Sequence, residues 1–499
     1  MLICETVMTR TLADLRAGRD AAAARNGRVG MVELRLDGLA PDELDVAGAL
    51  ADRALPVVVT CRAQWEGGQF TGSEDARLRI LSEAARLGAE FVDVEMEAET
   101  RVPGTITRIA AIDRGRTRIV VSHHAFTPGI SRGLADRVRV MRATAEALGA
   151  GSVTKVAVMA DRPRDCAALR KAVYPDGLVP DTVAIAMGPA GAVSRMLPAK
   201  FCTAWTFAGS AAPGQLGVEQ LIALYRVDEA TAATRVFGIG GRPLGHSASP
   251  AMHRAAFAAA GIDAVFVPVE TAEAGELLEL GDVLGFEGFS ITAPLKTKVV
   301  GWPHVHVDQH SRAIGAVNTL RRRDDGGWDA RNFDAAAFRA PLEAADVMLD
   351  GQRAIVIGAG GAARAAVGEL QHLGAAVEIA ARDAAKARLL AEEMGAAVSA
   401  WPPSGDAAIV VNATPVGTSP ADADAPIPAG SVRAALAYDL VYNPEDTTFL
   451  KDARAAGART IGGLEMLVHQ AARQCEWWTG ARVDADVFRR AAREFMGKS

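Results

Sequence analysis

The chain has 499 residues, 49% of them hydrophobic, and a formal net charge of −6 at pH 7. This length suits two or three domains with sizeable cores, and the acidic balance disfavours nucleic acid as a partner. No apolar run approaches the roughly 20 residues that span a bilayer, so we expect no membrane association. We expect no signal peptide either, because the first residues lack a basic region followed by an apolar stretch.

The cysteines indicate a reducing environment. There are five, none belongs to a Cys-x-x-Cys pair, and they are scattered at Cys4, Cys61, Cys166, Cys202 and Cys475. An odd, scattered set predicts free thiols in the cytoplasm, with no disulfide framework and no zinc knuckle.

Eight short β-rich runs precede residue 210. They begin near Leu2, Val29, Pro56, Phe91, Arg118, Val153, Thr182 and Phe201. Alanine-rich stretches with helical spacing, such as 73–87 and 134–148, separate most of them. Strand and helix alternating about eight times over about 200 residues predict a closed (β/α)8 TIM barrel, with an open doubly wound sheet as the alternative.

Alternation within these strands favours the barrel. In residues 32–37 (Val-Glu-Leu-Arg-Leu-Asp), Glu33, Arg35 and Asp37 share one face, because successive side chains point to opposite sides of a strand. A barrel interior can use such a polar face to line a ligand site. The same alternation groups Thr60 with Arg62, Ser122 with His124, and Lys155 with Ala157 and Met159.

Lys155 lies in the middle of an apolar strand, residues 154–159 (Thr-Lys-Val-Ala-Val-Met). Burial among small and apolar neighbours would disfavour the ammonium form and leave a nucleophilic amine. Such an amine condenses with a ketone to an iminium, which acidifies the adjacent C–H, and His124 is the candidate base for that proton. The alternatives are a surface lysine on an edge strand and a histidine pair, His123-His124, at a polar strand end.

Six segments in this order resemble type I 3-dehydroquinate dehydratase over roughly residues 1–225. They are 32–37, 60–68, 121–126, Lys155, Ser194-Arg195 and 213–215. The resemblance implies a Schiff-base lysine at Lys155, a general acid/base histidine at His124 and a glutamate that orients it at Glu66. The implied substrate contacts are Glu33, Arg35, Arg62, Arg195 and Gln215, with the planar guanidinium of Arg195 holding a carboxylate. Ala211 stands where this family usually has serine.

The polar segment 225–234 lacks Pro and Gly and predicts a tight connection to a new strand at Val236. Four polar segments follow. Residues 240–250 carry two serines in a Gly/Pro-rich turn, 288–296 place Thr292 and Lys296 near the start of a helix, and 315–319 and 332–334 add further polar residues within apolar sequence. Taken singly, these motifs are also typical of capped turns and of solvated lysines at helix starts.

A glycine-rich loop, residues 358–361 (Gly-Ala-Gly-Gly), lies between a predicted strand, 353–357, and a predicted helix, 362–373. Backbone N–H groups in such a loop can approach a pyrophosphate at the helix N-terminus. The next strand ends in Arg382, where an NAD-preferring fold usually carries Asp or Glu. Arginine suits a 2′-phosphate and predicts NADP, although Asp383 follows directly.

These motifs resemble shikimate dehydrogenase over roughly residues 235–499. Further matching segments are 412–417, 438–442 and 462–470. The resemblance implies a catalytic pair at Lys296 and Asp334. The implied substrate contacts are Ser247, Ser249, Thr292, Asn318, Tyr442 and Gln470, and the implied NADP contacts are Gly358, Gly360, Gly361, Arg382, Asn412 and Thr414. Two residues depart from the usual pattern: Ser290 replaces the Asn of many bacterial members, and Phe333 replaces a Thr.

The two halves, in this order, resemble the plant-type bifunctional family. We expect an α/β chain with three parts: a dehydratase barrel at 1–225, a substrate-binding domain at 235–345 completed by 460–499, and a Rossmann NADP-binding domain at 346–459. The implied chemistry converts 3-dehydroquinate to 3-dehydroshikimate and then, with NADPH, to shikimate. Motif spacing carries no information on oligomeric state or domain orientation.

Two other functions fit the motifs. The first is a catabolic quinate dehydrogenase, against which Ser249, Thr292 and Arg382 argue. The second is a non-catalytic sensor of the quinate pathway, against which the retained Lys155, His124, Lys296 and Asp334 argue. We expect no metal site at His304, His306 and His310, because no acid or cysteine cluster accompanies them.

Overall fold

A computed structural model describes residues 2–25, 27–112, 115–175, 177, 179–245, 247–419 and 424–497. The chain divides into two compact units. The first contains residues 1–234 together with 276–285, and the second contains 235–275 and 286–499. Within the described residues, each helix is too short or too polar to cross a membrane.

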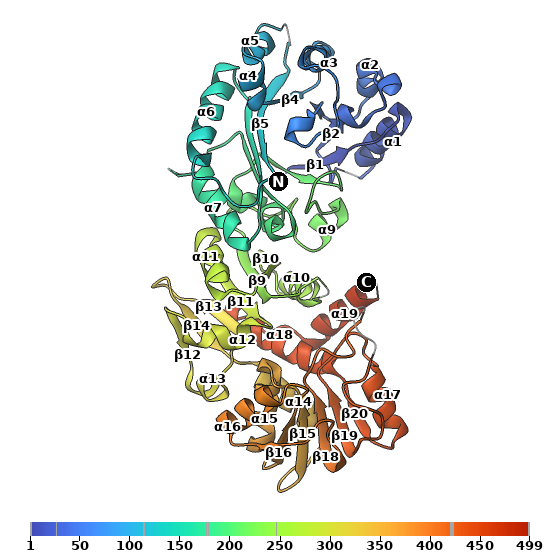
Figure 1. The fold of residues 1–499 in the computed structure, drawn as a ribbon, viewed down its shortest axis with the longest axis vertical. Coiled ribbons are helices and arrows are strands. Elements are labelled where there is room, and N and C mark those ends of the chain that lie inside the picture. Colours follow the sequence, from blue (N-terminus) through green and yellow to red (C-terminus); the bar gives the residue numbers. More distant parts are fainter. Residues whose placement is uncertain are drawn as a thin grey trace. The chain divides into compact units, whose positions relative to one another are not determined.

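The first unit is built on eight parallel strands, coloured blue to green in Figure 1. They are β1 (Leu2–Val7), β2 (Met31–Arg35), β3 (Val57–Thr60), β4 (Phe91–Glu95), β5 (Arg118–Ala125), β6 (Val153–Met159), β7 (Thr182–Met187) and β8 (Trp205–Ala208). Their spatial order is β7-β6-β5-β4-β3-β2-β1-β8, so β1 pairs with both β2 and β8.

The barrel is nearly closed. No ladder joins β7 to β8 among the described residues, but the N–H of Ala204 donates to the carbonyl of Thr182 at 2.8 Å. The predicted TIM barrel is therefore confirmed and the open-sheet alternative is wrong. The last strand begins at Trp205 and not near Phe201, because Pro198–Phe201 forms a turn of 3-10 helix.

Helices cover the outside of the barrel. They are α1 (Leu12–Ala23), α2 (Val46–Leu50), α3 (Glu74–Arg86), α4 (Glu97–Arg101), α5 (Thr105–Ala110), α6 (Leu134–Ala147), α7 (Pro163–Val173), α8 (Val193–Met196) and α9 (Val218–Ala223). Side-chain caps fix where several of them begin: the hydroxyls of Thr11 and Ser73 accept from the N–H groups of Asp14 and Ala76. After α9, the segment 225–234 is packed, since Tyr225 and Val227 are buried.

The second unit contains two sheets. The mixed first sheet has the order β10-β9-β11-β13-β14-β12, with β13 antiparallel to both of its neighbours. Its strands are β9 (Arg235–Gly241), β10 (Ala264–Glu270), β11 (Phe286–Ile291), β12 (Val305–Val307), β13 (Thr319–Arg322) and β14 (Trp328–Arg331). The associated helices are α10 (Ser249–Ala259), α12 (Leu295–Lys298) and α13 (Gln309–Ile314). Most of α11 (Ala274–Leu284) belongs to the first unit.

The other sheet is parallel and has the Rossmann order β17-β16-β15-β18-β19-β20. Its strands are β15 (Arg353–Ile357), β16 (Ala376–Ala380), β17 (Ala397–Val398), β18 (Gly405–Asn412), β19 (Val432–Asp439) and β20 (Arg459–Ile461). The associated helices are α14 (Asp334–Ala344), α15 (Gly361–His372), α16 (Ala384–Met394) and α17 (Thr448–Ala455).

Both faces of the Rossmann sheet are buried, as its nearly continuous apolar strands require. Ala354 and Val356 pack with α14, α15 and α16, whereas Ile355 and Ile357 pack with α17. The last two helices, α18 (Gly463–Thr479) and α19 (Ala485–Met496), return to the first sheet and pack with α10 against Phe237 and Phe266. The chain end thus completes the lobe in which this unit began.

Candidate active sites

A cavity of about 100 Å³ lies at the carboxyl ends of the barrel strands. Eight residues predicted from the sequence line it together: Glu33, Arg35, Arg62, Glu66, His124, Lys155, Arg195 and Gln215. Ala211 and Ala212 of the β8–α9 loop also line this cavity. TIM barrels place their ligand sites at this end of the strands.

Lys155 is 5% exposed and lies between two carboxylates. Its Nζ is 3.0 Å from Asp93 Oδ2, 3.4 Å from Glu33 Oε1 and 4.4 Å from the centre of the Phe207 ring. The expectation of purely small and apolar surroundings was therefore wrong. Neighbours along a strand are apolar, but neighbouring strands bring their inward-facing carboxylates to the lysine.

Asp93 and Glu95 were not among the residues predicted from the sequence. Both are fully buried, and Arg62 Nη1 donates to Asp93 Oδ1, Glu95 Oε1 and Ser122 Oγ at 2.9, 2.8 and 2.9 Å. Burial alone would raise the pKa of Asp93, but Arg62 and Lys155 hold it well below its usual range. The alternation of Phe-Val-Asp-Val-Glu in β4 is the signal that would have found both acids.

His124 and Glu66 form a buried pair. His124 Nδ1 lies 2.8 Å from Glu66 Oε2, which leaves Nε2 as the other ring nitrogen for proton transfer. Burial raises the pKa of Glu66 to about 8. Burial also lowers the pKa of His124 well below its ordinary value, and the nearby Arg62 and Lys155 lower it further. The imidazole is therefore neutral near pH 7, as a general base must be.

The remaining cationic and amide groups lie around the cavity. Arg35 makes a bidentate ion pair with Asp37, with distances of 2.9 and 2.8 Å. Arg195 donates from Nη1 to the carbonyl of Ala186, and its buried Nε has no partner among the described residues. Burial lowers the pKa of Arg195 to about 10. A buried guanidinium with an unused donor is suited to a carboxylate ligand.

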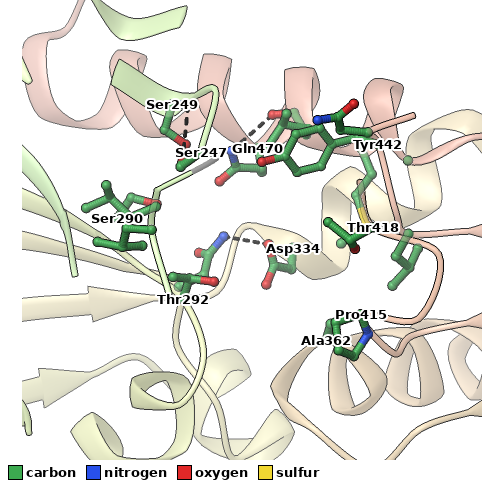
Figure 2. A pocket seen from close by; sticks show the side chains of 18 of the residues that line it. Ser247, Ser249, Ser290, Thr292, Asp334, Ala362, Pro415, Thr418, Tyr442 and Gln470 are labelled. Atoms are coloured by element: carbon green, nitrogen blue, oxygen red, sulfur yellow. Dashed lines mark hydrogen bonds between the residues drawn. The ribbon is translucent and has the colours of Figure 1, made fainter. Parts of the chain in front are cut away.

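A second cavity opens between the two sheets of the second unit. It is lined by all eight predicted catalytic and substrate-contact residues: Ser247, Ser249, Thr292, Lys296, Asn318, Asp334, Tyr442 and Gln470. Figure 2 shows Ser247, Ser249, Tyr442 and Gln470 on one side and Thr292 and Asp334 across from them. His246 of the serine motif lies outside the described residues.

The predicted catalytic pair is in direct contact. Lys296 Nζ lies 2.5 Å from Asp334 Oδ2, and Asn318 Nδ2 donates to Asp334 Oδ1 at 2.8 Å. Asp334 is the first residue of α14, and its carboxylate is 6% exposed. The carboxylate is thus held between a cation and an amide at the bottom of the cavity.

The serine motif lies at the start of α10. The N–H of Ser249 donates to Ser247 Oγ at 3.3 Å, and Tyr442 lies against the same hydroxyl. Burial raises the pKa of the Tyr442 phenol, so it is protonated and can donate. These three hydroxyl groups and the amide of Gln470 form a polar wall that carries no full charge.

A groove beside this cavity follows the glycine loop. It is lined by five predicted cofactor contacts: Gly358, Gly360, Gly361, Arg382 and Thr414. Gly358 has φ +116°, and a Cβ on Gly361 would lie 2.8 Å from Lys296 Cβ, so both positions favour glycine. The groove and the substrate cavity share Thr292 and Lys296, so a cofactor in one would meet a substrate in the other there.

Asn412 does not line the groove, in contrast to the other predicted cofactor contacts. It is fully buried, and its Nδ2 donates to Asp439 Oδ1 and to the carbonyl of Val416. Its Oδ1 accepts both the N–H and the hydroxyl of Thr414. Asn412 therefore fixes the position of Thr414, which lines the groove, and does not line the groove itself.

The structure separates the roles of Arg382 and Asp383. Asp383 caps α16, because its Oδ1 accepts from the N–H groups of Ala385 and Lys386 at 3.1 and 3.2 Å. Arg382 and Lys386 both line the groove. The Asp383 carboxylate is occupied by the helix cap, and the two cations are available to a ligand in the groove. This part of the groove therefore suits a 2′-phosphate better than a ribose 2′-hydroxyl.

Two departures from the usual pattern also have places in the structure. The Phe333 ring packs edge-on against Trp477 with centroids 5.6 Å apart, and Phe333 is not among the residues that line the substrate cavity. Ser290 lines that cavity and accepts from Gln474 Nε2 at 3.2 Å.

These features define a two-domain enzyme with one lysine-centred site and one dinucleotide-dependent site. Three family models match: Type I 3-dehydroquinase over residues 3–232, the shikimate dehydrogenase substrate binding domain over 239–320, and the shikimate 5′-dehydrogenase C-terminal domain over 463–493.

A full-length relative extends these matches. A chloroplastic bifunctional 3-dehydroquinate dehydratase/shikimate dehydrogenase of Arabidopsis thaliana is 31% identical over 98% of this chain and 83% of its own length. This chain belongs to that bifunctional family.

Two further relatives match the second half. A shikimate dehydrogenase (NADP(+)) of Anaeromyxobacter dehalogenans is 41% identical over 52% of this chain and 96% of its own length. A shikimate 5-dehydrogenase structure from Thermus thermophilus, in complex with NADP(H) and shikimate, is 34% identical with a TM-score of 0.48. It covers 52% of this chain and 99% of the Thermus chain.

Proposed function

We propose that this protein catalyses two successive steps of the shikimate pathway: dehydration of 3-dehydroquinate to 3-dehydroshikimate, and NADPH-dependent reduction of that product to shikimate. Membership of the bifunctional family supports both activities. The observation that carries the residue assignments is that each of the two predicted sets of catalytic and substrate-contact residues lines a single cavity.

In the first site, Lys155 is the proposed nucleophile. An amine attacks a ketone in its neutral form, so Lys155 must first pass a proton to one of the carboxylates that it contacts, Asp93 or Glu33, before it attacks the C3 ketone. The iminium that forms, with loss of water, acidifies the C2–H bond, and His124 takes that proton. The imidazolium then returns the proton to the C1 hydroxyl as it leaves, and hydrolysis of the iminium frees Lys155. Arg195 holds the substrate carboxylate.

Glu66 would stabilise the imidazolium of His124, which gives a testable pH dependence. The pKa of Glu66 is about 8, so its carboxylate gains charge as pH rises through that value. An ionised Glu66 stabilises the positive charge that develops on His124, so the dehydration rate should rise through about pH 8. Glu66→Gln should lack this inflection and stay at the lower rate. Initial rates of enone formation between acidic and alkaline pH would measure it, and an unchanged inflection in Glu66→Gln would exclude Glu66 as its source.

In the second site, Lys296 and Asp334 are the proposed proton donors. NADPH, when bound, supplies the hydride to the C3 ketone of 3-dehydroshikimate. Lys296 lies where the cofactor groove joins the substrate cavity and can protonate the oxygen that becomes the alcohol. Asp334 then takes up a proton from water and passes it to Lys296 through their direct contact, which restores the ammonium. Ser247, Ser249 and Tyr442 would anchor the carboxylate with neutral donors.

Arg382 and Lys386 are the proposed contacts for the 2′-phosphate of NADP. Arg382→Ala should raise the KM for NADPH by about 10- to 100-fold, because a charge-assisted bidentate contact is lost. The KM for NADH should change little, since NADH lacks that phosphate. Steady-state rates with both cofactors would test this. An equal loss with both cofactors would show that Arg382 shapes the groove without recognising the phosphate.

The proposed partners are these small-molecule substrates and NADP(H). The five cysteines are all free thiols, which suits a reducing compartment, and we propose the cytoplasm as the location.

The first experiment is to incubate the purified protein with 3-dehydroquinate, with and without NADPH, and to follow the conjugated enone and NADPH together. Enone should accumulate without NADPH, and shikimate should appear as NADPH is consumed. Enone without NADPH oxidation would mean a dehydrogenase of another specificity, with quinate as the next substrate to try. The absence of enone, with ligand binding retained, would favour a sensor.

A further inference from the structure

A directed chain of hydrogen bonds leads from α18 to the carboxylate of Asp334. Gln474 Nε2 donates to Thr319 Oγ1 at 2.9 Å, and the Thr319 hydroxyl donates to Asn318 Oδ1 at 2.8 Å. Asn318 Nδ2 then donates to Asp334 Oδ1 at 2.8 Å. Gln474 and Thr319 are fully buried, and neither lines the substrate cavity.

A backbone group fixes the direction of this chain. The N–H of Phe333 donates to the side-chain oxygen of Asn318 at 2.8 Å. A backbone N–H can only donate, so the atom facing it must be the carbonyl oxygen of the Asn318 amide. The amide nitrogen of Asn318 is therefore the atom that faces Asp334. The alternative amide orientation would place two donors against each other and leave two carbonyl-like oxygens in contact.

The same reasoning extends outward to Gln474. The Thr319 hydroxyl has a single hydrogen, which it must donate to Asn318 Oδ1, so only its lone pairs remain for Gln474. Gln474 must therefore present its NH2 group. The backbone carbonyl of Asn318 at 3.1 Å and the hydroxyl oxygen of Ser290 at 3.2 Å also lie within reach of that NH2 group. Two hydrogens are thus shared among three buried acceptors.

We propose that Gln474 and Thr319 are positioning residues for the reduction, which rests on the proposed function of Lys296 and Asp334. They hold the Asn318 amide so that Asp334 Oδ1 always accepts a hydrogen bond. Proton exchange is thereby confined to Oδ2, the oxygen that contacts Lys296. Without the Thr319 hydroxyl, only the N–H of Phe333 would hold the Asn318 oxygen. The amide would then turn more easily, and in the turned orientation its oxygen would repel the carboxylate and disturb the contact with Lys296.

Thr319→Val tests this chain with little change in shape, because a methyl group replaces the hydroxyl. With 3-dehydroshikimate as substrate, the kcat should fall by about 10- to 100-fold, the size expected for a lost hydrogen bond that supports a charged group. The KM values for this substrate and for NADPH should stay within about threefold, since neither residue lines the substrate cavity. Thr319→Ser is the matched control: it keeps the hydroxyl and should turn over nearly as fast as the unchanged protein.

Gln474→Met removes the first donor of the chain and should lower kcat in the same way. If the two residues act through one chain, the double variant should be little slower than the slower single variant, so the effects should not multiply. The dehydration rate of each sample reports the amount of active barrel, and NADPH binding reports the fold of the second unit.

Several results would overturn the proposal. They are an unchanged kcat in Thr319→Val, an equal loss in Thr319→Ser, a rise in KM without loss of kcat, or effects that multiply fully in the double variant. If one of the two single variants no longer binds NADPH, the kcat of the other variant tests the proposal. If both lose NADPH binding, these residues support the fold and do not position the carboxylate. Failure of the unchanged protein to reduce 3-dehydroshikimate would instead refute the proposed function itself.

Discussion

Lys155→Ala is expected to lower the rate of dehydration by more than about a thousandfold, because Lys155 is the one amine among the described residues that line the barrel cavity and could form the iminium. Reduction of added 3-dehydroshikimate should stay within about twofold of its normal rate, since Lys155 lines only the barrel cavity. Enone formation from 3-dehydroquinate and NADPH oxidation with 3-dehydroshikimate would be measured on the same protein sample.

A borohydride experiment tests the chemistry directly. Reduction in the presence of substrate should attach a product to the unchanged protein but not to Lys155→Ala, and mass spectrometry would locate the attachment. Lys171→Ala is the matched control, because Lys171 is an exposed lysine of the same barrel whose Nζ binds Glu279. Full dehydration by Lys155→Ala, or loss of both activities in a folded protein, would refute the separate lysine site.

Lys296→Ala should have the opposite effect and slow the turnover of 3-dehydroshikimate by about a thousandfold while sparing dehydration. The alcohol oxygen would lose its proton donor, and Asp334 would lose its cationic partner at 2.5 Å. NADPH consumption with 3-dehydroshikimate measures the loss, and the KM for NADPH should show that the groove is intact.

Lys298→Ala is the control for that substitution. Lys298 lies on the same short helix, two residues away, but its Nζ contacts the carbonyl of Ala272 and the carboxylate of Glu273 on the exposed side. It should reduce 3-dehydroshikimate at the normal rate. A comparable loss in both variants would mean that α12 had been disturbed and that the proton-donor role is not established.

The fold could be predicted from the sequence because its signals are local. Alternating strand patterns and alanine-rich helices recur along the first half, and the predicted and observed strand starts differ by four residues at most, at Trp205. This largest difference arose because Pro198–Phe201, which is mostly apolar, forms a turn of 3-10 helix. Motif residues such as Lys155 and Lys296 could be placed by resemblance, since each lies within a recognisable segment.

The surroundings of those residues could not be predicted in the same way. The carboxylates around Lys155 come from β2 and β4, 122 and 62 residues away in sequence, and only the closed barrel brings them together. Asn412 was predicted to contact the cofactor, but its side chain makes four hydrogen bonds within the protein, to Val416, Asp439 and Thr414. Gln474 lies 155 residues from Thr319, and no short motif links them.

Gly361 limits which substitutions the second site can accept. Its backbone opens the cofactor helix on one lobe, and a single added methyl would come within 2.8 Å of Lys296 Cβ on the other. The spacing between the start of the cofactor helix and Lys296, the proposed proton donor, therefore depends on the absence of one carbon atom at Gly361. A larger side chain at Gly361 would displace the cofactor helix and Lys296 together. A substitution there would therefore change cofactor affinity and proton delivery at the same time.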